Sequence, residues 1–106
     1  MEITNPQTET IAGRLEHLAL LYRQGQASEI MTRTLSKLFD YEIETCRNQL
    51  QQLQKDLSDF EREYSMSSEE FYQRFHKGLT HDNMDFTEWA SLIQMSGSLE
   101  ERLALL

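Results

Sequence analysis

The chain has 106 residues, 39% of them hydrophobic and 26% charged, with four glycines and one proline. This is the length of one small domain, and so few turn residues argue against a sheet protein and favour long helices. A formal net charge of −8 argues against unaided binding to DNA or RNA, because such binding depends on Lys and Arg side chains that neutralise phosphates.

The cellular compartment is predicted from what the chain lacks. Cys46 is the only cysteine, so no internal disulfide can form and no cysteine zinc site is expected. Residues 1–6 lack the basic and apolar regions of a signal peptide. The longest apolar run, residues 18–22, is far shorter than the roughly 20 residues of a membrane span. We therefore expect a cytoplasmic protein with no membrane contact.

The first predicted helix covers residues 6–24. Asn5 is a good capping residue, and Pro6 suits the first helical position. The apolar residues that follow are spaced by four, three and four, which places them on one helical face: Ile11, Leu15, Leu18 and Tyr22. Gly25 and Ser28 then offer a helix stop and a new cap. The sequence leaves open whether the chain turns there or continues as one longer helix.

The second predicted helix, residues 28–64, carries the strongest pattern in the chain. Its apolar residues alternate steps of four and three without interruption, as in a heptad repeat. No Gly or Pro occurs from residue 27 to residue 64. The residues of this heptad seam are Phe39, Ile43, Cys46, Leu50, Leu53, Leu57 and Phe60, continued by Tyr64.

A helix of this length needs a packing partner. It would extend about 55 Å, whereas a compact domain of this size has a radius of gyration of only about 13 Å. In a parallel dimer Glu42 would meet Arg47 favourably, but Asp56 would meet Glu61 unfavourably, so flanking charges do not favour that pairing. We therefore expect an antiparallel hairpin or an antiparallel homodimer, with the heptad seam as the dimer interface.

Two shorter helices are predicted after residue 64. Ser67 and Glu70 form a capping box that opens a helix over residues 68–77, which Gly78 ends. Asp85 and Glu88 form a second capping box, and a helix over residues 86–105 follows.

Gly97 weakens this last helix by roughly 1 kcal/mol relative to Ala, and we expect a bend near it. The predicted fold is all-α: one domain, residues 1–106, with a long heptad-patterned helix and a short C-terminal helical pair.

Carboxylates one helical turn apart raise the possibility of a metal enzyme. Asp56 with Asp59, and Asp85 with Glu88, are pairs that could hold Mg²⁺ in a nucleotide phosphohydrolase. The first pair flanks the seam on a solvated edge, and capping already explains the second. We therefore predict no metal and no cofactor.

Histidine and cysteine chemistry is also disfavoured. His76 lies at a helix C-terminus, where it suits the helix dipole, and His81 lies in a polar loop at irregular spacing from possible co-ligands. Cys46 occupies a seam position, where it fills space as a small apolar residue. No phosphate-binding loop or nucleophile elbow is present, so we predict that the protein is not an enzyme.

Aromatic and methionine side chains are concentrated after residue 64. Met beside aromatics is common at surfaces that bind partners, but such residues can equally close a small core. We assign Phe86 and Trp89 to a C-terminal core.

Two segments of the C-terminal half resemble a known family. Residues 64–75 have the sequence YSMSSEEFYQRF, and residues 84–92 have MDFTEWASL. Together they resemble a family of small helical bacterial proteins common in cyanobacteria, over roughly residues 42–106. Position 65 is Ser where the family is expected to have Gly, and residues 80–83 are less acidic than expected.

The resemblance implies a function in protein binding. Some members of the family are encoded beside small toxins of the TumE type and are regarded as their antitoxins. An acidic helical antitoxin would cover a small basic toxin with carboxylates in place of phosphates. The expected partner-binding residues are Glu69, Glu70, Tyr72, Asp82 and Asp85. The alternatives are a homodimeric coiled-coil adaptor and the Mg²⁺-dependent phosphohydrolase considered above.

Overall fold

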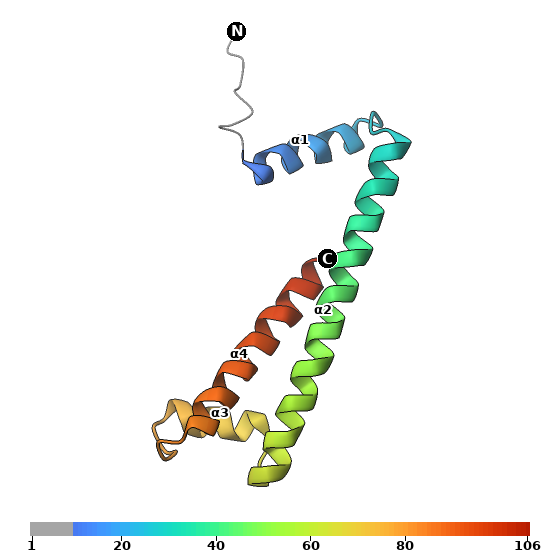
Figure 1. Cartoon of the computed structure of the whole chain (residues 1–106). Helices are drawn as coiled ribbons and strands as arrows, with labels where there is room; N and C mark the ends of the chain where they lie inside the picture. Colours follow the sequence, from blue (N-terminus) through green and yellow to red (C-terminus); the bar gives the residue numbers. More distant parts are fainter. Residues whose placement is uncertain (1–9) are drawn as a thin grey trace. The chain divides into compact units, whose positions relative to one another are not determined.

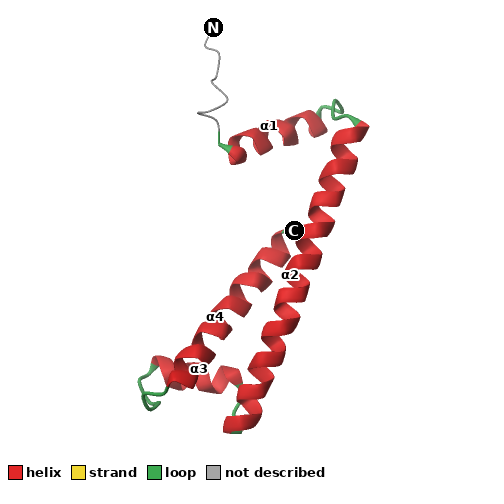
Figure 2. Ribbon diagram, in the orientation of Figure 1, coloured by secondary structure: helices red, strands yellow, loops and turns green. Residues whose placement is uncertain are grey.

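A computed structural model describes residues 10–106, which form four α-helices and no strand (Figure 1, Figure 2). The predicted all-α fold is confirmed for this part of the chain. The helices are α1 (Ile11–Arg23), α2 (Glu29–Tyr64), α3 (Ser68–His76) and α4 (Met84–Leu105).

The chain divides into two compact units. The boundary follows Leu38, so the first unit contains α1 and the start of α2, and the second unit is Phe39–Leu106. We call residues 10–38 the N-terminal helix pair and residues 39–106 the C-terminal unit.

Helix α1 begins later than predicted. Thr10 has an extended backbone and is the N-cap, because its hydroxyl accepts a hydrogen bond of 3.0 Å from the Gly13 amide. The predicted cap, Asn5, and the following Pro6 lie outside the described residues. A threonine hydroxyl at this position satisfies an amide that has no partner within the helix.

The chain turns between α1 and α2, which settles the question that the sequence left open. Gly25 has φ +69°, a conformation that costs a side-chain-bearing residue about 1–2 kcal/mol. The Gln26 amide then donates to the Leu21 carbonyl at 2.9 Å, as expected after such a C-terminal glycine. Ser28 opens α2 by accepting a hydrogen bond from the Met31 amide at 3.2 Å.

Helix α3 is capped by Ser67 as predicted, but the capping box is incomplete. The Ser67 hydroxyl accepts from the Glu70 amide at 3.1 Å. Glu70 itself pairs with Arg74 at 2.8 Å instead of closing the box. A carboxylate from α2 satisfies another amide of the first turn, because Glu61 accepts from the Ser68 amide at 2.8 Å.

Helix α4 begins at Met84, two residues before the prediction, and its N-cap is Asn83. The predicted capping role of Asp85 is wrong: Asp85 lies in the first turn and accepts a hydrogen bond from the Tyr64 hydroxyl at 2.6 Å. The helix continues through Gly97 without a break, because a glycine lowers helix propensity but keeps its backbone hydrogen bond.

The core of the C-terminal unit is aromatic. Phe71 of α3 and Trp89 of α4 are almost completely buried and stack with ring centroids 3.9 Å apart at an angle of 4°. The Trp89 indole N–H donates to the Ser68 hydroxyl at 2.9 Å. The prediction that Phe86 and Trp89 belong to a core is confirmed. Other side chains packed on this cluster are Leu57, Phe60, Tyr64, Met66, Tyr72, Phe75, Phe86 and Ile93.

Within the C-terminal unit, α2 and α4 form an antiparallel hairpin. Tyr64 at the end of α2 bonds to Asp85 at the start of α4. Near the other end, Glu42 pairs with Arg102 at 2.8 Å. An antiparallel hairpin was one of the two arrangements that the heptad seam predicted, and the other, an antiparallel homodimer, stays a prediction.

Most side chains of the heptad seam are buried or half-buried within the single chain. Cys46 is 2% exposed and Leu53 7% exposed, and Leu57 and Phe60 pack against the aromatic cluster. Ile43 and Leu50 are half-buried. Phe39, at the start of the unit, is 46% exposed. The most buried seam residues therefore have little surface left to offer a second chain.

Candidate functional site

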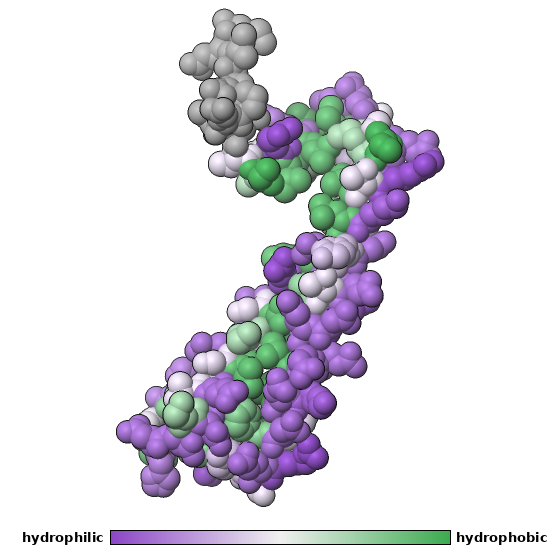
Figure 3. Space-filling view, in the orientation of Figure 1, coloured by the Kyte–Doolittle hydropathy of each residue, from purple (hydrophilic) through white to green (hydrophobic). Residues whose placement is uncertain are grey.

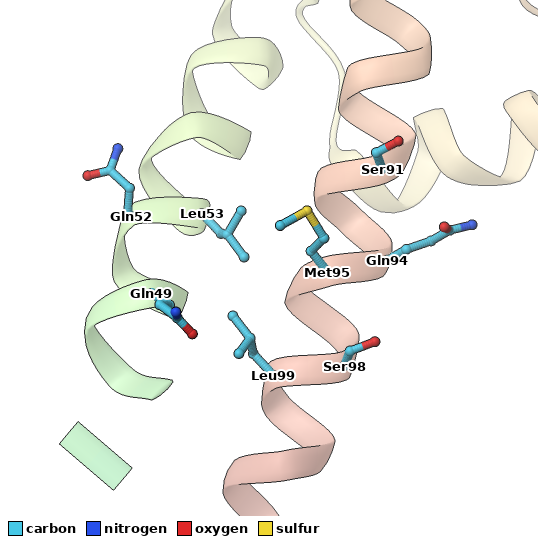
Figure 4. Close-up of a pocket in the computed structure, with 8 residues that line it drawn as sticks. All are labelled: Gln49, Gln52, Leu53, Ser91, Gln94, Met95, Ser98 and Leu99. Carbon is cyan, nitrogen blue, oxygen red and sulfur yellow. The ribbon is translucent and has the colours of Figure 1, made fainter. Parts of the chain in front are cut away.

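An open pocket lies between α2 and α4 in the C-terminal unit (Figure 4). Its volume is about 670 Å³. Leu53 of α2 and the side chains of Met95 and Leu99 of α4 form its apolar part, and Figure 4 shows the three pointing toward one another. Amides and hydroxyls complete the lining: Gln49, Gln52, Ser91, Gln94 and Ser98.

A second, smaller pocket is acidic. It has a volume of about 290 Å³ and lies beside Phe60. Three of its acids come from α2 and one from α4: Asp56, Asp59, Glu63 and Glu88. Of the four, Asp59 forms an ion pair with Arg62.

The two pockets adjoin along the same faces of the two helices. On each helix a row of lining residues follows at steps of three and four, so each row occupies one helical face. The α2 row is Gln49, Gln52, Asp56, Asp59 and Glu63, and the α4 row is Glu88, Ser91, Met95 and Ser98. Leu53, Phe60, Gln94 and Leu99 lie beside these rows and complete the lining. The Gln52 amide of the first pocket donates to Asp56 of the second at 3.2 Å.

These pockets therefore form one surface, which we call the α2/α4 groove. One end is apolar and adaptable, because Met95 is unbranched and 52% exposed. The other end is negative. An apolar end followed by a negative end is complementary to a segment that carries apolar and basic side chains in the same order.

The five partner-binding residues predicted from the resemblance do not form a single cluster. Glu69 is exposed in the first turn of α3, and Asp82 is exposed in the loop before α4. Glu70 pairs with Arg74. Tyr72 is half-buried, and its hydroxyl accepts from the Gln94 amide at 3.1 Å. Within the described chain, no hydrogen bond joins any two of the five.

Asp85, the fifth of these residues, is half-buried and already has a partner. It accepts the hydrogen bond from the Tyr64 hydroxyl. This bond, followed by desolvation and the Asp85 charge, raises the pKa of Tyr64 above its ordinary value, because ionising the phenol would place two negative charges side by side. Asp85 therefore stabilises the junction between α2 and α4.

The fold brings three of the four carboxylates considered for Mg²⁺ to one pocket and holds the fourth elsewhere. Glu88 lines the groove with Asp56 and Asp59, whereas Asp85 is held by Tyr64. Among residues 10–106, no group of three or more His, Cys, Asp or Glu side chains has the arrangement that a metal site requires.

Sequence analysis missed several groove residues. It assigned Asp56, Asp59 and Glu88 to a dimer flank, to possible metal ligands or to a capping box, and it gave no role to Glu63. The signal that could have found them was the row of polar residues at steps of three and four beside the heptad seam, from Gln49 to Glu63. This row flanks a seam that α4 covers, and the cover could not be assigned from periodicity alone.

Comparison with known proteins gives no match: no family model, no curated protein and no solved structure matches this chain. None of the helices described here is long and apolar enough to cross a membrane.

Proposed function

We propose that this chain is a protein-binding module and that the α2/α4 groove binds a basic, amphipathic segment of its partner. The observation that carries the proposal is the order of surfaces in the groove. Leu53, Met95 and Leu99 offer an apolar contact, and a row of carboxylates follows directly along α2. An amphipathic helix that binds in a groove uses this combination of apolar anchors and flanking charges.

Charge supports a basic partner. Residues 39–106 contain fourteen acidic and six basic side chains, so this unit accounts for the whole net charge of −8. An acidic surface accelerates encounter with a basic protein and disfavours nucleic acid and acidic partners.

A small basic toxin is the partner that the family resemblance implies, which makes the chain an antitoxin in this proposal. The carboxylates of the groove would then occupy the cationic surface with which such a toxin contacts phosphates. Glu69, Glu70 and Asp82, which are exposed, supply further negative charge on the same unit. No catalytic step is assigned to the chain.

The alternative function is a homodimeric adaptor. The Glu42–Arg102 pair and the burial of Cys46 show that the seam is occupied by α4 within one chain. An adaptor would therefore need another surface for its second copy.

The proposal is tested by capture of partners from the native host. The tagged full chain is compared with a groove variant, Asp56→Asn with Glu63→Gln and Glu88→Gln. Three charge contacts worth about 0.5–1 kcal/mol each predict a loss of affinity of roughly tenfold or more. We expect the wild-type chain to retain a small basic protein and the groove variant to lose it.

A matched control removes the same charge elsewhere. Glu44, Glu100 and Glu101 are exposed and do not line the groove. Their replacement by Gln should leave capture intact. Equal loss in both variants would show that overall charge, not the groove, binds the partner, and absence of any basic partner would refute the proposed function. Incubation with nucleotides and Mg²⁺ should release no phosphate, and release would favour the phosphohydrolase.

A further inference from the structure

The N-terminal helix pair exposes an apolar face that nothing in the pair covers. Helix α1 contains no buried residue. Figure 3 shows apolar side chains gathered over α1 and the first turns of α2. The exposed members are Ile11 (70%), Leu15 (52%), Leu21 (36%), Tyr22 (38%), Ile30 (69%) and Leu38 (50%).

This exposure is large enough for a stable protein interface. A large apolar side chain that is fully exposed counts for roughly 200 Å², so these six expose on the order of 600 Å² together. Each partner in a standard interface contributes about 800 Å². Contiguous apolar patches of this kind mark interaction sites in soluble proteins.

The face is also hollowed where α1 meets α2. One hollow of about 420 Å³ is lined mainly by α1, with Met31 from α2. A neighbouring hollow of about 270 Å³ is lined by Leu18 with Ile30, Met31, Thr34 and Leu35. The Tyr22 hydroxyl and the Thr32 hydroxyl, 2.8 Å apart, hold the two helices together at the turn. The two helices therefore form a fixed site with unfilled apolar space.

Charge favours a second copy of this chain as the occupant. Residues 1–38 carry four acidic and four basic side chains and are formally neutral, counting Glu2 and Glu9, which lie outside the described residues. Two such units do not repel each other, and they offer a strongly basic or acidic partner no net attraction. A repeat of the same face in a two-fold dimer is therefore the arrangement that this charge balance allows best.

The spacing of the α1 residues specifies the pairing. Ile11, Leu15, Leu18 and Tyr22 are separated by four, three and four, an order that is unchanged when the direction is reversed. In an antiparallel pair, Ile11 then meets Tyr22 of the second copy, and Leu15 meets its Leu18.

The positions that flank this row agree with the pairing. In the antiparallel register, Ala12 lies opposite Ala19 of the second copy, and Arg14 lies opposite its Leu21. No two like charges meet, and the alanines allow the helices to approach closely.

We propose that the N-terminal helix pair is a homodimerisation surface on which α1 packs antiparallel against α1 of a second copy. The inference specifies the surface for the self-association that the adaptor alternative requires, but it is independent of the α2/α4 groove. The protein would then have two separate binding surfaces, one for itself and one for a basic partner.

The first test is the molar mass of the full chain in solution, measured by light scattering after size exclusion over a range of concentrations. We expect a dimer of twice 12.5 kDa. Leu15→Glu should give the monomer mass with unchanged helicity. Leu105→Glu, at a residue that is 90% exposed on α4, is the matched control and should remain a dimer. A monomeric wild-type chain, or a monomeric Leu105→Glu control, would overturn the inference.

The second test fixes the register and does not depend on the folding of the Leu15 variant. Ala12→Cys and Ala19→Cys proteins are oxidised separately and as a mixture, while Cys46 stays buried. Antiparallel pairing predicts a disulfide-linked dimer in the mixture and none in either protein alone. Self-linking of either variant, or no linking in the mixture, would overturn the proposed pairing.

The two proposals fail independently. If the groove variant stays dimeric but loses the basic partner, both surfaces act as described. If Leu15→Glu loses the basic partner together with the dimer, the helix pair is part of the partner-binding surface, and its assignment as a separate homodimer surface is wrong.

Discussion

The two units of this chain are both built from helices but differ in how they bury apolar side chains. The C-terminal unit encloses Phe71 and Trp89, which are 1% and 0% exposed. In the N-terminal helix pair, α1 has no buried residue at all. Three helices meet around the first cluster, so each apolar face finds a neighbour, whereas two helices leave one face open.

The two units also differ in net charge. The unit with its own core carries the whole net charge of −8, and the unit with the open apolar face is neutral. A charged surface around a completed core suits a partner of opposite charge, and a neutral open face suits a copy of itself. Under the two proposals made above, recognition of a foreign partner and self-association would use different parts of the chain.

The largest expected effect is the loss of the core tryptophan. Trp89→Ala removes the stack on Phe71 and the hydrogen bond to Ser68, and we expect a loss of about 3–5 kcal/mol in the free energy of unfolding. Urea unfolding followed by circular dichroism measures it, because the variant lacks the only tryptophan.

A matched change in the N-terminal helix pair should have far less effect. Leu20 is 49% exposed and lies off the row that we propose for dimerisation. Leu20→Ala should change the free energy of unfolding by no more than about 0.5 kcal/mol. If the two variants lose similar stability, the contrast between a closed and an open unit is wrong.

Periodicity predicted the helices well because each depends on local sequence. The seam from Phe39 to Tyr64 predicted most of α2 and its last residue, and Ser67 predicted the start of α3. Periodicity could not predict which helix packs against the seam, because a heptad pattern is the same whether α4 or a second chain covers it.

The local signals that failed were overruled by tertiary contacts or by competing residues. Asp85 is of a residue type and at a position that favour helix capping. Its carboxylate instead accepts a hydrogen bond from Tyr64, 21 positions earlier, and Asn83 caps α4. The candidate groove was harder still to predict, because the polar row on α2 lines a groove only when α4 lies beside it.

A moderate effect is expected at the end of α2. Three helices in the described chain end with a residue at positive φ: α1 at Gly25, α3 at Gly78, and α2 at Ser65 with φ 50°. A side chain in this conformation costs about 1–2 kcal/mol, partly offset by the greater chain entropy of glycine. Ser65→Gly should therefore stabilise the C-terminal unit by roughly 0.5–1 kcal/mol, seen as a rise of a few degrees in Tm.

Gly78 provides the opposite change as a control. It has φ +69°, and a β-carbon added there would meet no other atom within 4 Å, so only the backbone conformation opposes a substitution. Gly78→Ala should lower the free energy of unfolding by about 1 kcal/mol. A destabilising Ser65→Gly would mean that the serine side chain contributes more to the α2–α3 turn than its backbone costs.

The smallest effect concerns the Tyr64–Asp85 hydrogen bond, which closes the C-terminal unit. The bond raises the pKa of Tyr64 above the ordinary value of 10.0. Its contribution to stability is therefore fully present below pH 10 and is lost as the pH rises through the raised pKa. The difference in absorbance titration between the wild-type chain and Tyr64→Phe reports the ionisation of Tyr64, and we expect the midpoint of this difference above pH 10. A midpoint at or below pH 10 would mean that the phenol is not bonded to Asp85 in solution.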